Sequence, residues 1–100
     1  MEKLLWWLIA GTKGGKNRGL IIENLQETPY NINQIAKKLN LDYKTVKHHM
    51  MILEDNKIVI SSGASYGNIY FLTKIMEENM PVFNEIWSKF RNKNKGGFEE

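Results

Sequence analysis

The chain has 100 residues, of which 42% are hydrophobic and 25% charged, as expected of one globular domain without room for a separate catalytic module. It contains no cysteine, which excludes disulfides, zinc–thiolate sites and cysteine nucleophiles and fits a cytoplasmic location. The formal net charge is +3, and residues 11–50 hold seven basic but three acidic side chains. This local excess of positive charge favours a nucleic-acid partner for that segment.

The first predicted element is a short helix that includes the apolar run from Leu4 to Ala10. The run is too short to span a bilayer, which takes about 20 apolar residues. The charges of Glu2 and Lys3 cancel, so the basic start of a secretion signal is missing. We therefore expect a buried or interface helix and no stable membrane insertion.

A glycine-rich stretch over residues 11–15 should end this helix and act as a hinge. Its two outer glycines are one residue too close for a phosphate-binding loop, and Asn17 follows Lys16 where that loop needs a hydroxyl. The spacing therefore disfavours nucleotide binding. Lys16 is instead a candidate for contact with a DNA phosphate.

Two helices are predicted next, over residues 16–26 and from about residue 32 to 39. Pro29 ends the first, because it lacks an N–H and pushes the preceding residue away from helical angles. Asn31 can cap the second, and Gln34 three residues later completes the amide version of a capping box. Asn40 follows and tolerates the left-handed conformation of a tight turn.

The following helix is expected from its cap at Asp42 to about Asp55. A helical wheel of 100° per residue gives this helix one core-facing side, formed by Val46, Met50 and Leu53. The opposite side is basic and polar, with Lys44, His48 and Met51 and with Lys47 at its border. No carboxylate interrupts that side before Glu54.

A β-hairpin is predicted after this helix, with strands over residues 57–60 and 69–71. The connecting residues 61–68 are rich in Gly, Ser and Asn and make a loop longer than a tight turn. From Thr73 a helical pattern resumes, and Pro81 should kink it or start a new helix. We expect residues 1–91 to form the domain and residues 92–100 a flexible tail.

The predicted order is helix, helix, turn, helix, hairpin, helix. This is a mainly α fold with a small β-hairpin (α+β), namely a winged helix-turn-helix with extra N- and C-terminal helices. Residues 31–54, NINQIAKKLNLDYKTVKHHMMILE, resemble the ArsR-like winged-helix regulators of archaea and bacteria. The Gly-Thr-x-Gly-Gly stretch at residues 11–15 and the segment 41–46 look especially similar to an archaeal subgroup.

The resemblance implies a double-stranded-DNA-binding transcriptional regulator, with the helix over residues 42–54 in the major groove and the wing over residues 61–68 on the backbone or minor groove. The residues that we expect to contact DNA are Tyr43, Lys44, Thr45, Lys47, His48, Met51, Lys38, Lys16 and Tyr66. Lysines suit phosphates or guanine edges, and a histidine can donate to either. Tyr43 and Tyr66 have a second interpretation as packing residues.

The terminal segments carry more aromatic surface than one thin domain is expected to hide. By the resemblance these helices form a homodimer, which would place two recognition helices about one DNA turn apart. The residues expected at the dimer interface are Leu5, Trp6, Leu8, Phe83, Ile86, Trp87 and Phe90. The alternative is a monomer whose terminal helices cover its own core.

Other functions are disfavoured by the residues present. Adjacent side chains on a helix point about 100° apart, so His48 and His49 do not converge on one metal ion; the resemblance suggests that His49 faces the core and His48 faces DNA. No nucleophile–base pair or phosphate loop indicates an enzyme, and no cofactor is expected. The main alternative is a winged-helix protein–protein interaction module without DNA binding. An effector ligand stays unknown.

Overall fold

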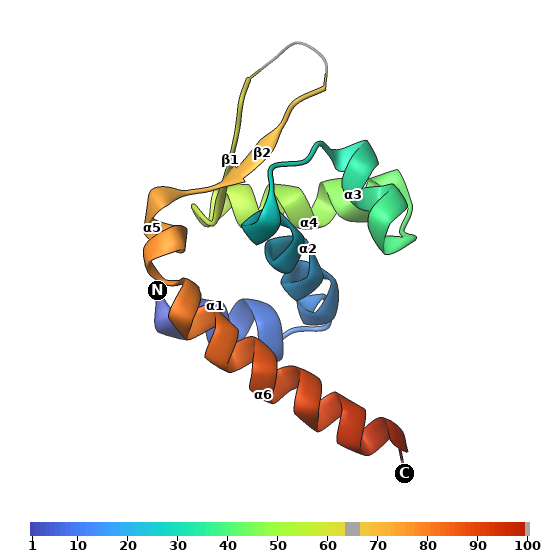
Figure 1. Cartoon of the computed structure of the whole chain (residues 1–100), viewed down its shortest axis with the longest axis vertical. Coiled ribbons are helices and arrows are strands. Elements are labelled where there is room, and N and C mark those ends of the chain that lie inside the picture. Colours follow the sequence, from blue (N-terminus) through green and yellow to red (C-terminus); the bar gives the residue numbers. More distant parts are fainter. Residues whose placement is uncertain (64–66, 100) are drawn as a thin grey trace.

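The computed structural model describes residues 1–63 and 67–99, with residues 94–99 as backbone only. The described chain forms a mainly helical winged-helix fold with one antiparallel hairpin, as predicted (Figure 1). The elements in chain order are α1 (Glu2–Ala10), α2 (Gly15–Glu27), α3 (Ile32–Leu39), α4 (Tyr43–Asp55), β1 (Val59–Ser61), β2 (Tyr70–Leu72), α5 (Lys74–Glu78) and α6 (Met80–Glu99). The hairpin and the α3–α4 pair occupy one end of the molecule, and α1 and α6 the other.

Local signals set the boundaries of the helix-turn-helix. The Gln34 backbone N–H donates to the Asn31 side chain, and the Asn31 N–H donates to the Gln34 side chain, each over 2.8 Å. Asn40 ends α3 with a left-handed φ of 56°. Both predictions are confirmed. Asp42 does precede α4, but its carboxylate accepts a hydrogen bond from the Thr45 hydroxyl instead of from a backbone N–H.

The wing is tied to the helices at its base. Strands β1 and β2 begin and end later than the sequence predicted, and Val59 pairs with Leu72. The Tyr70 N–H donates to the Tyr30 carbonyl over 2.9 Å, so the segment before α3 adds an isolated bridge to the hairpin. This backbone hydrogen bond holds the wing against the helix-turn-helix, because Tyr30 directly precedes the cap of α3.

Helix α2 crosses α1 and α6 at close range, which explains why two positions in its first half are glycine. A Cβ at Gly15 would overlap the Ile9 carbonyl of α1, and a Cβ at Gly19 would overlap the Trp87 ring of α6. Trp87 also donates through its ring N–H to the Glu23 carboxylate over 3.1 Å. The glycine-rich stretch therefore serves helix packing as well as the turn after α1.

Most of the residues predicted for a dimer interface lie inside the single chain. Helix α1 packs on α6, and five of the seven predicted residues are 5% exposed or less there: Leu5, Leu8, Phe83, Ile86 and Trp87. The aromatic side chains stack on one another along α6, with ring centroids 5.9 Å and 5.6 Å apart for the Phe83–Trp87 and Trp87–Phe90 pairs. The terminal helices thus bury most of this surface within the chain itself.

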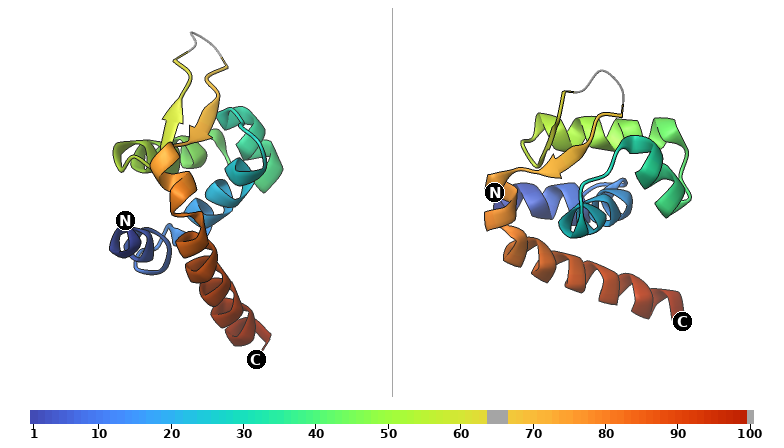
Figure 2. Two further views of the ribbon diagram at one scale, coloured as in Figure 1. Left: turned by 60° about the vertical axis from the view of Figure 1, so that its left-hand side comes forward. Right: turned by 45° about the horizontal axis from the view of Figure 1, so that its top comes forward.

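The last two helices are separated where the sequence predicted a break. Helix α5 is capped by Thr73, whose side chain accepts from the Met76 N–H, and α6 begins with Pro81 in its first turn. Helix α6 then continues to Glu99, past the point where we expected a flexible tail to begin. In both views of Figure 2, the C-terminal part of α6 runs beyond the rest of the molecule.

Candidate nucleic-acid interface

Helix α4 separates core and solvent as its sequence predicted. Val46, Met50 and Leu53 are completely buried, and His49 is buried beside them. The opposite side is open to solvent and consists of Tyr43, Lys44, Lys47, His48 and Met51. Tyr43 is 46% exposed and Met51 55% exposed, so neither is a core residue. We call these five residues the α4 face.

The lysines near this face form no ion pair with a carboxylate among the described residues. Within the part of the chain that the structure describes, the ion pairs are Lys89–Glu85 and Arg91–Glu23, both at the α6 end of the molecule. Lys44 and Lys47 on α4, and Lys37 and Lys38 on α3, are exposed and join none of these pairs. Lys38 lies over the Tyr30 ring with its ammonium 5.6 Å from the ring centre. This arrangement creates a positive surface beside the helix-turn-helix.

Three other residues that were predicted to contact DNA are not part of the α4 face. The Thr45 hydroxyl donates to Asp42, so its proton is not available to a DNA phosphate, although its oxygen can still accept a hydrogen bond. Lys16 is exposed, but it lies in the first turn of α2 and not on the α4 face. Tyr66 lies outside the described residues.

Arg18 contributed to the positive charge counted from the sequence, yet it is 5% exposed and does not face solvent. Its Nε donates to the Leu8 carbonyl over 3.0 Å, and its terminal nitrogens donate to the Thr12 hydroxyl and, over 3.2 Å, to His49 Nδ1. Burial lowers the pKa of Arg18. Burial, and then the charges of Arg18 and His48, lower the pKa of His49. His49 is therefore neutral, and this cluster joins α1, α2 and α4 in the interior.

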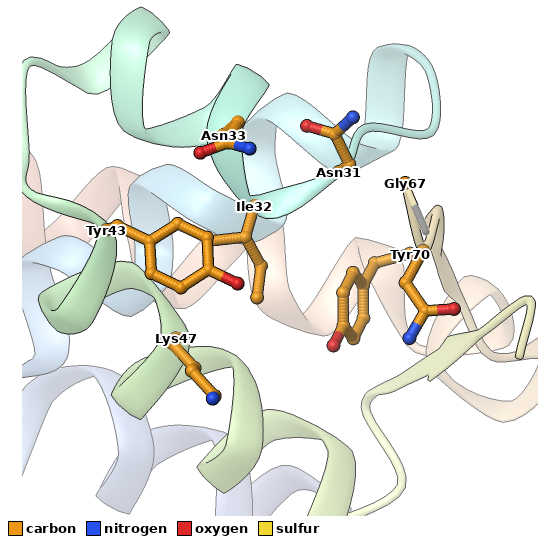
Figure 3. Close-up of a pocket in the computed structure, with 8 residues that line it drawn as sticks. Asn31, Ile32, Asn33, Tyr43, Lys47, Gly67 and Tyr70 are labelled. Carbon is orange, nitrogen blue, oxygen red and sulfur yellow. The ribbon is translucent and has the colours of Figure 1, made fainter. Parts of the chain in front are cut away.

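A hollow of about 260 Å³ opens between α3, α4 and the wing (Figure 3). Its lining residues are Asn31, Ile32, Asn33, Tyr43, Lys47, Gly67, Asn68 and Tyr70. Tyr43 and Lys47 belong to the α4 face, whereas Asn33, Asn68 and Tyr70 were not predicted as site residues. We call this hollow the α3–α4–wing pocket. Sequence reasoning missed it because its residues come from three separate elements.

The architecture and the surface together define a class of protein. A helix-turn-helix followed directly by a β-hairpin, with a basic exposed face on its second helix, is the winged-helix arrangement of DNA-binding regulators. Residues 15–61 match the family profile described as "Bacterial regulatory protein, arsR family". That span runs from the first residue of α2 to the last residue of β1. The matched segment is therefore similar to the helix-turn-helix domain of that family, whose profile describes regulatory proteins.

Solved structures share the fold. The reduced form of the transcriptional regulator YodB from B. subtilis is 24% identical, with a TM-score of 0.66 over 82% of this chain and 81% of that chain. A MarR transcriptional regulator from Methanosarcina mazei Go1 is 18% identical, with a TM-score of 0.70 over 86% of this chain and 60% of that one. A variant of ZitR from Lactococcus lactis is 21% identical, with a TM-score of 0.66 over 88% of this chain and 60% of its own. Among curated proteins, no sequence matches this chain.

The described residues contain no group of three or more His, Cys, Asp or Glu side chains placed to hold a metal ion. No described helix has the length and apolar character needed to cross a membrane.

Proposed function

We propose that this protein is a sequence-preferring, double-stranded-DNA-binding transcriptional regulator that inserts α4 into the major groove. The observation that carries the proposal is the α4 face, on which Lys44, Lys47 and His48 are exposed and the two lysines take no part in the described ion pairs. Lysines on such a face displace counterions from DNA phosphates, and exposed donors can read base edges in the groove.

The wing supports contact with DNA beside the groove that α4 enters. The hairpin projects past α4 in Figures 1 and 2, and the bridge between Tyr30 and Tyr70 holds its base. We infer that the wing reaches the backbone or the minor groove.

Because Arg18 is buried, the helix-turn-helix presents lysines and no arginine, and bidentate recognition of guanine is limited. The preference for sequence is therefore modest and depends partly on DNA shape. The proposed location is the cytoplasm, where bacterial and archaeal DNA lies.

The first test is binding to duplex DNA across a salt series. We expect the wild type to bind with a steep salt dependence, and Lys44→Ala/Lys47→Ala to lower the slope of log K against log salt by about two. The matched control is Lys3→Ala/Lys74→Ala, which removes two exposed lysines from α1 and α5 and should leave the slope unchanged. Absence of binding by the wild type even at low salt would contradict the proposal and favour the protein-interaction alternative.

We also propose that the regulator acts as a homodimer, through Trp6 of the predicted set together with its neighbour Trp7. With the inner faces of α1 and α6 buried, the apolar groups still open on α1 are Trp6, 36% exposed, and Trp7, 57% exposed. Aromatic side chains are enriched in protein interfaces, and a twofold dimer would present two copies of α4 to successive major grooves.

A further inference from the structure

The α3–α4–wing pocket is polar, and most of its polar side chains have no hydrogen-bond partner among the described residues. The Tyr70 side chain is 9% exposed, yet no described residue hydrogen-bonds its hydroxyl. The Asn68 side-chain oxygen is buried and also unpartnered among the described residues. A buried polar group without a partner costs free energy, so the Asn68 oxygen indicates a ligand or ordered water that completes it. The Tyr70 hydroxyl is not a buried atom of this kind and is open to the same hollow.

The chemistry of the lining favours an anion. Lys47 brings a positive charge that no described carboxylate pairs with, and Tyr43 and Tyr70 bring hydroxyl donors. Figure 3 shows the Tyr43 hydroxyl directed towards Tyr70, with Lys47 on α4 beside Tyr43. Burial, and then the charges of Glu54 and Tyr43, raise the pKa of Tyr70, so its hydroxyl keeps the proton that it would donate.

The amides and the helix end add to this environment. Asn33 lies in the first turn of α3, where helix N–H groups point outward and the helix dipole is positive. A half-turn about χ2 of Asn68 exchanges its buried oxygen for the NH2 group, which would donate to an anion at the same place. The pocket therefore combines one cation with donors from three elements.

We propose that the α3–α4–wing pocket binds a phosphate group, with Lys47 supplying charge and Tyr43, Tyr70, Asn33 and Asn68 supplying hydrogen-bond donors. This inference rests on the proposed function for its favoured source of phosphate, the DNA backbone beside the groove that α4 enters. Such a contact fixes the register of α4 on the duplex and carries no base information. A free phosphate compound is the other source with the same chemistry.

The decisive variant is Tyr70→Phe, which removes one hydroxyl and no charge. We expect it to weaken duplex binding by about tenfold, as for a lost hydrogen bond to a charged group, with an unchanged salt slope. Lys47→Gln should instead lower the slope by about one. The matched control is Tyr30→Phe, because Tyr30 lies beside β2 but outside the pocket lining. Since the Tyr70 hydroxyl has no described partner, thermal unfolding of Tyr70→Phe should match that of the wild type.

A second arm uses inorganic phosphate at constant ionic strength and follows the Tyr70 and Asn68 signals by NMR. If the wild type binds duplex and Tyr70→Phe binds equally well, the pocket proposal is overturned while DNA binding stands. If the wild type binds no duplex, saturable shifts at Tyr70 and Asn68 that are absent in Tyr70→Phe would support a free phosphate ligand. If those shifts are also absent, the pocket proposal is overturned together with the proposed function.

Discussion

Arg18 is a cation held in the protein interior without a carboxylate among its described partners. Its hydrogen bonds go to the Leu8 carbonyl, the Thr12 hydroxyl and His49 Nδ1. Because an arginine nitrogen can only donate, Nδ1 of His49 must accept, and the ring is neutral with its proton on Nε2. Protonating His49 would put two cations in contact inside the core. The pair therefore links the pH of the solution to the packing of α4 against α1 and α2.

The free energy of unfolding should consequently decrease as the pH falls below neutrality. The folded pKa of His49 is lowered below the ordinary histidine value of 6.5, so the unfolded chain binds the proton more readily than the folded one. The stabilisation is fully present above that value and is lost as pH falls towards the folded pKa. In urea unfolding between pH 7 and pH 5, we expect His49→Gln to flatten the decline in the free energy of unfolding. The exposed control, His48→Gln, should keep most of the wild-type slope, because burial and Arg18 lower the pKa of His49 more than His48 does. An unchanged slope in His49→Gln would contradict the assignment.

At the scale of elements, the position of α6 depends on a glycine in α2. The Trp87 ring lies where a side chain at residue 19 would be, and it is stacked between Phe83 and Phe90. The Trp87 N–H and the Arg91 guanidinium both donate hydrogen bonds to the Glu23 carboxylate, each over 3.1 Å. A shift of the Trp87 ring would therefore break its hydrogen bond to Glu23. Packing, charge and hydrogen bonding thus hold the α2–α6 crossing together.

Gly19→Ala should therefore destabilise the protein although alanine favours helices. Overpacking costs about 1–3 kcal/mol, whereas helix propensity returns at most about 1 kcal/mol. We expect a net loss of about 1 kcal/mol in the free energy of unfolding, measured by denaturant titration. Gln26→Ala, on the exposed side of the same helix, should change stability by less than about 0.5 kcal/mol. In a double-mutant cycle, Trp87→Leu should relieve the clash; strictly additive effects would contradict this account.

At the scale of the whole molecule, the two ends have separate tasks. The α3–α4 pair and the wing form the end proposed to bind DNA, and α1 with α6 forms the opposite end (Figure 1). Most aromatic side chains at that opposite end serve the chain's own core, which leaves Trp6 and Trp7 for contact with a second copy. A dimer built there would leave the α4 face of each copy open.

Trp7→Lys should therefore reduce dimerisation without unfolding the chain, because Trp7 is 57% exposed. By sedimentation equilibrium we expect a dimer for the wild type and a shift towards monomer for the variant. Ile60→Lys is the matched control, since Ile60 is 55% exposed but lies on β1 in the wing. A wild type that stays monomeric at high micromolar concentration would rule out the dimer.

The sequence by itself determined the local features of the fold, because each depends on neighbouring residues. The capping box of Asn31 and Gln34, the left-handed turn at Asn40 and the helix break near Pro81 are formed by residues a few positions apart. The two sides of α4 follow from helical periodicity alone. Together with the order of elements, these features predicted the winged-helix class and the exposed lysines.

Only the tertiary structure decided what distant residues do together. Arg18 counts as a surface charge in the sequence, but its contacts with Leu8 and His49 exist only after α1, α2 and α4 assemble. The α3–α4–wing pocket likewise needs Tyr70 to be brought beside Tyr43. The aromatic residues of α1 and α6 were equally compatible with a partner subunit or their own core, because hydrophobic burial has no direction. In the structure, most of them are buried in the core of their own chain.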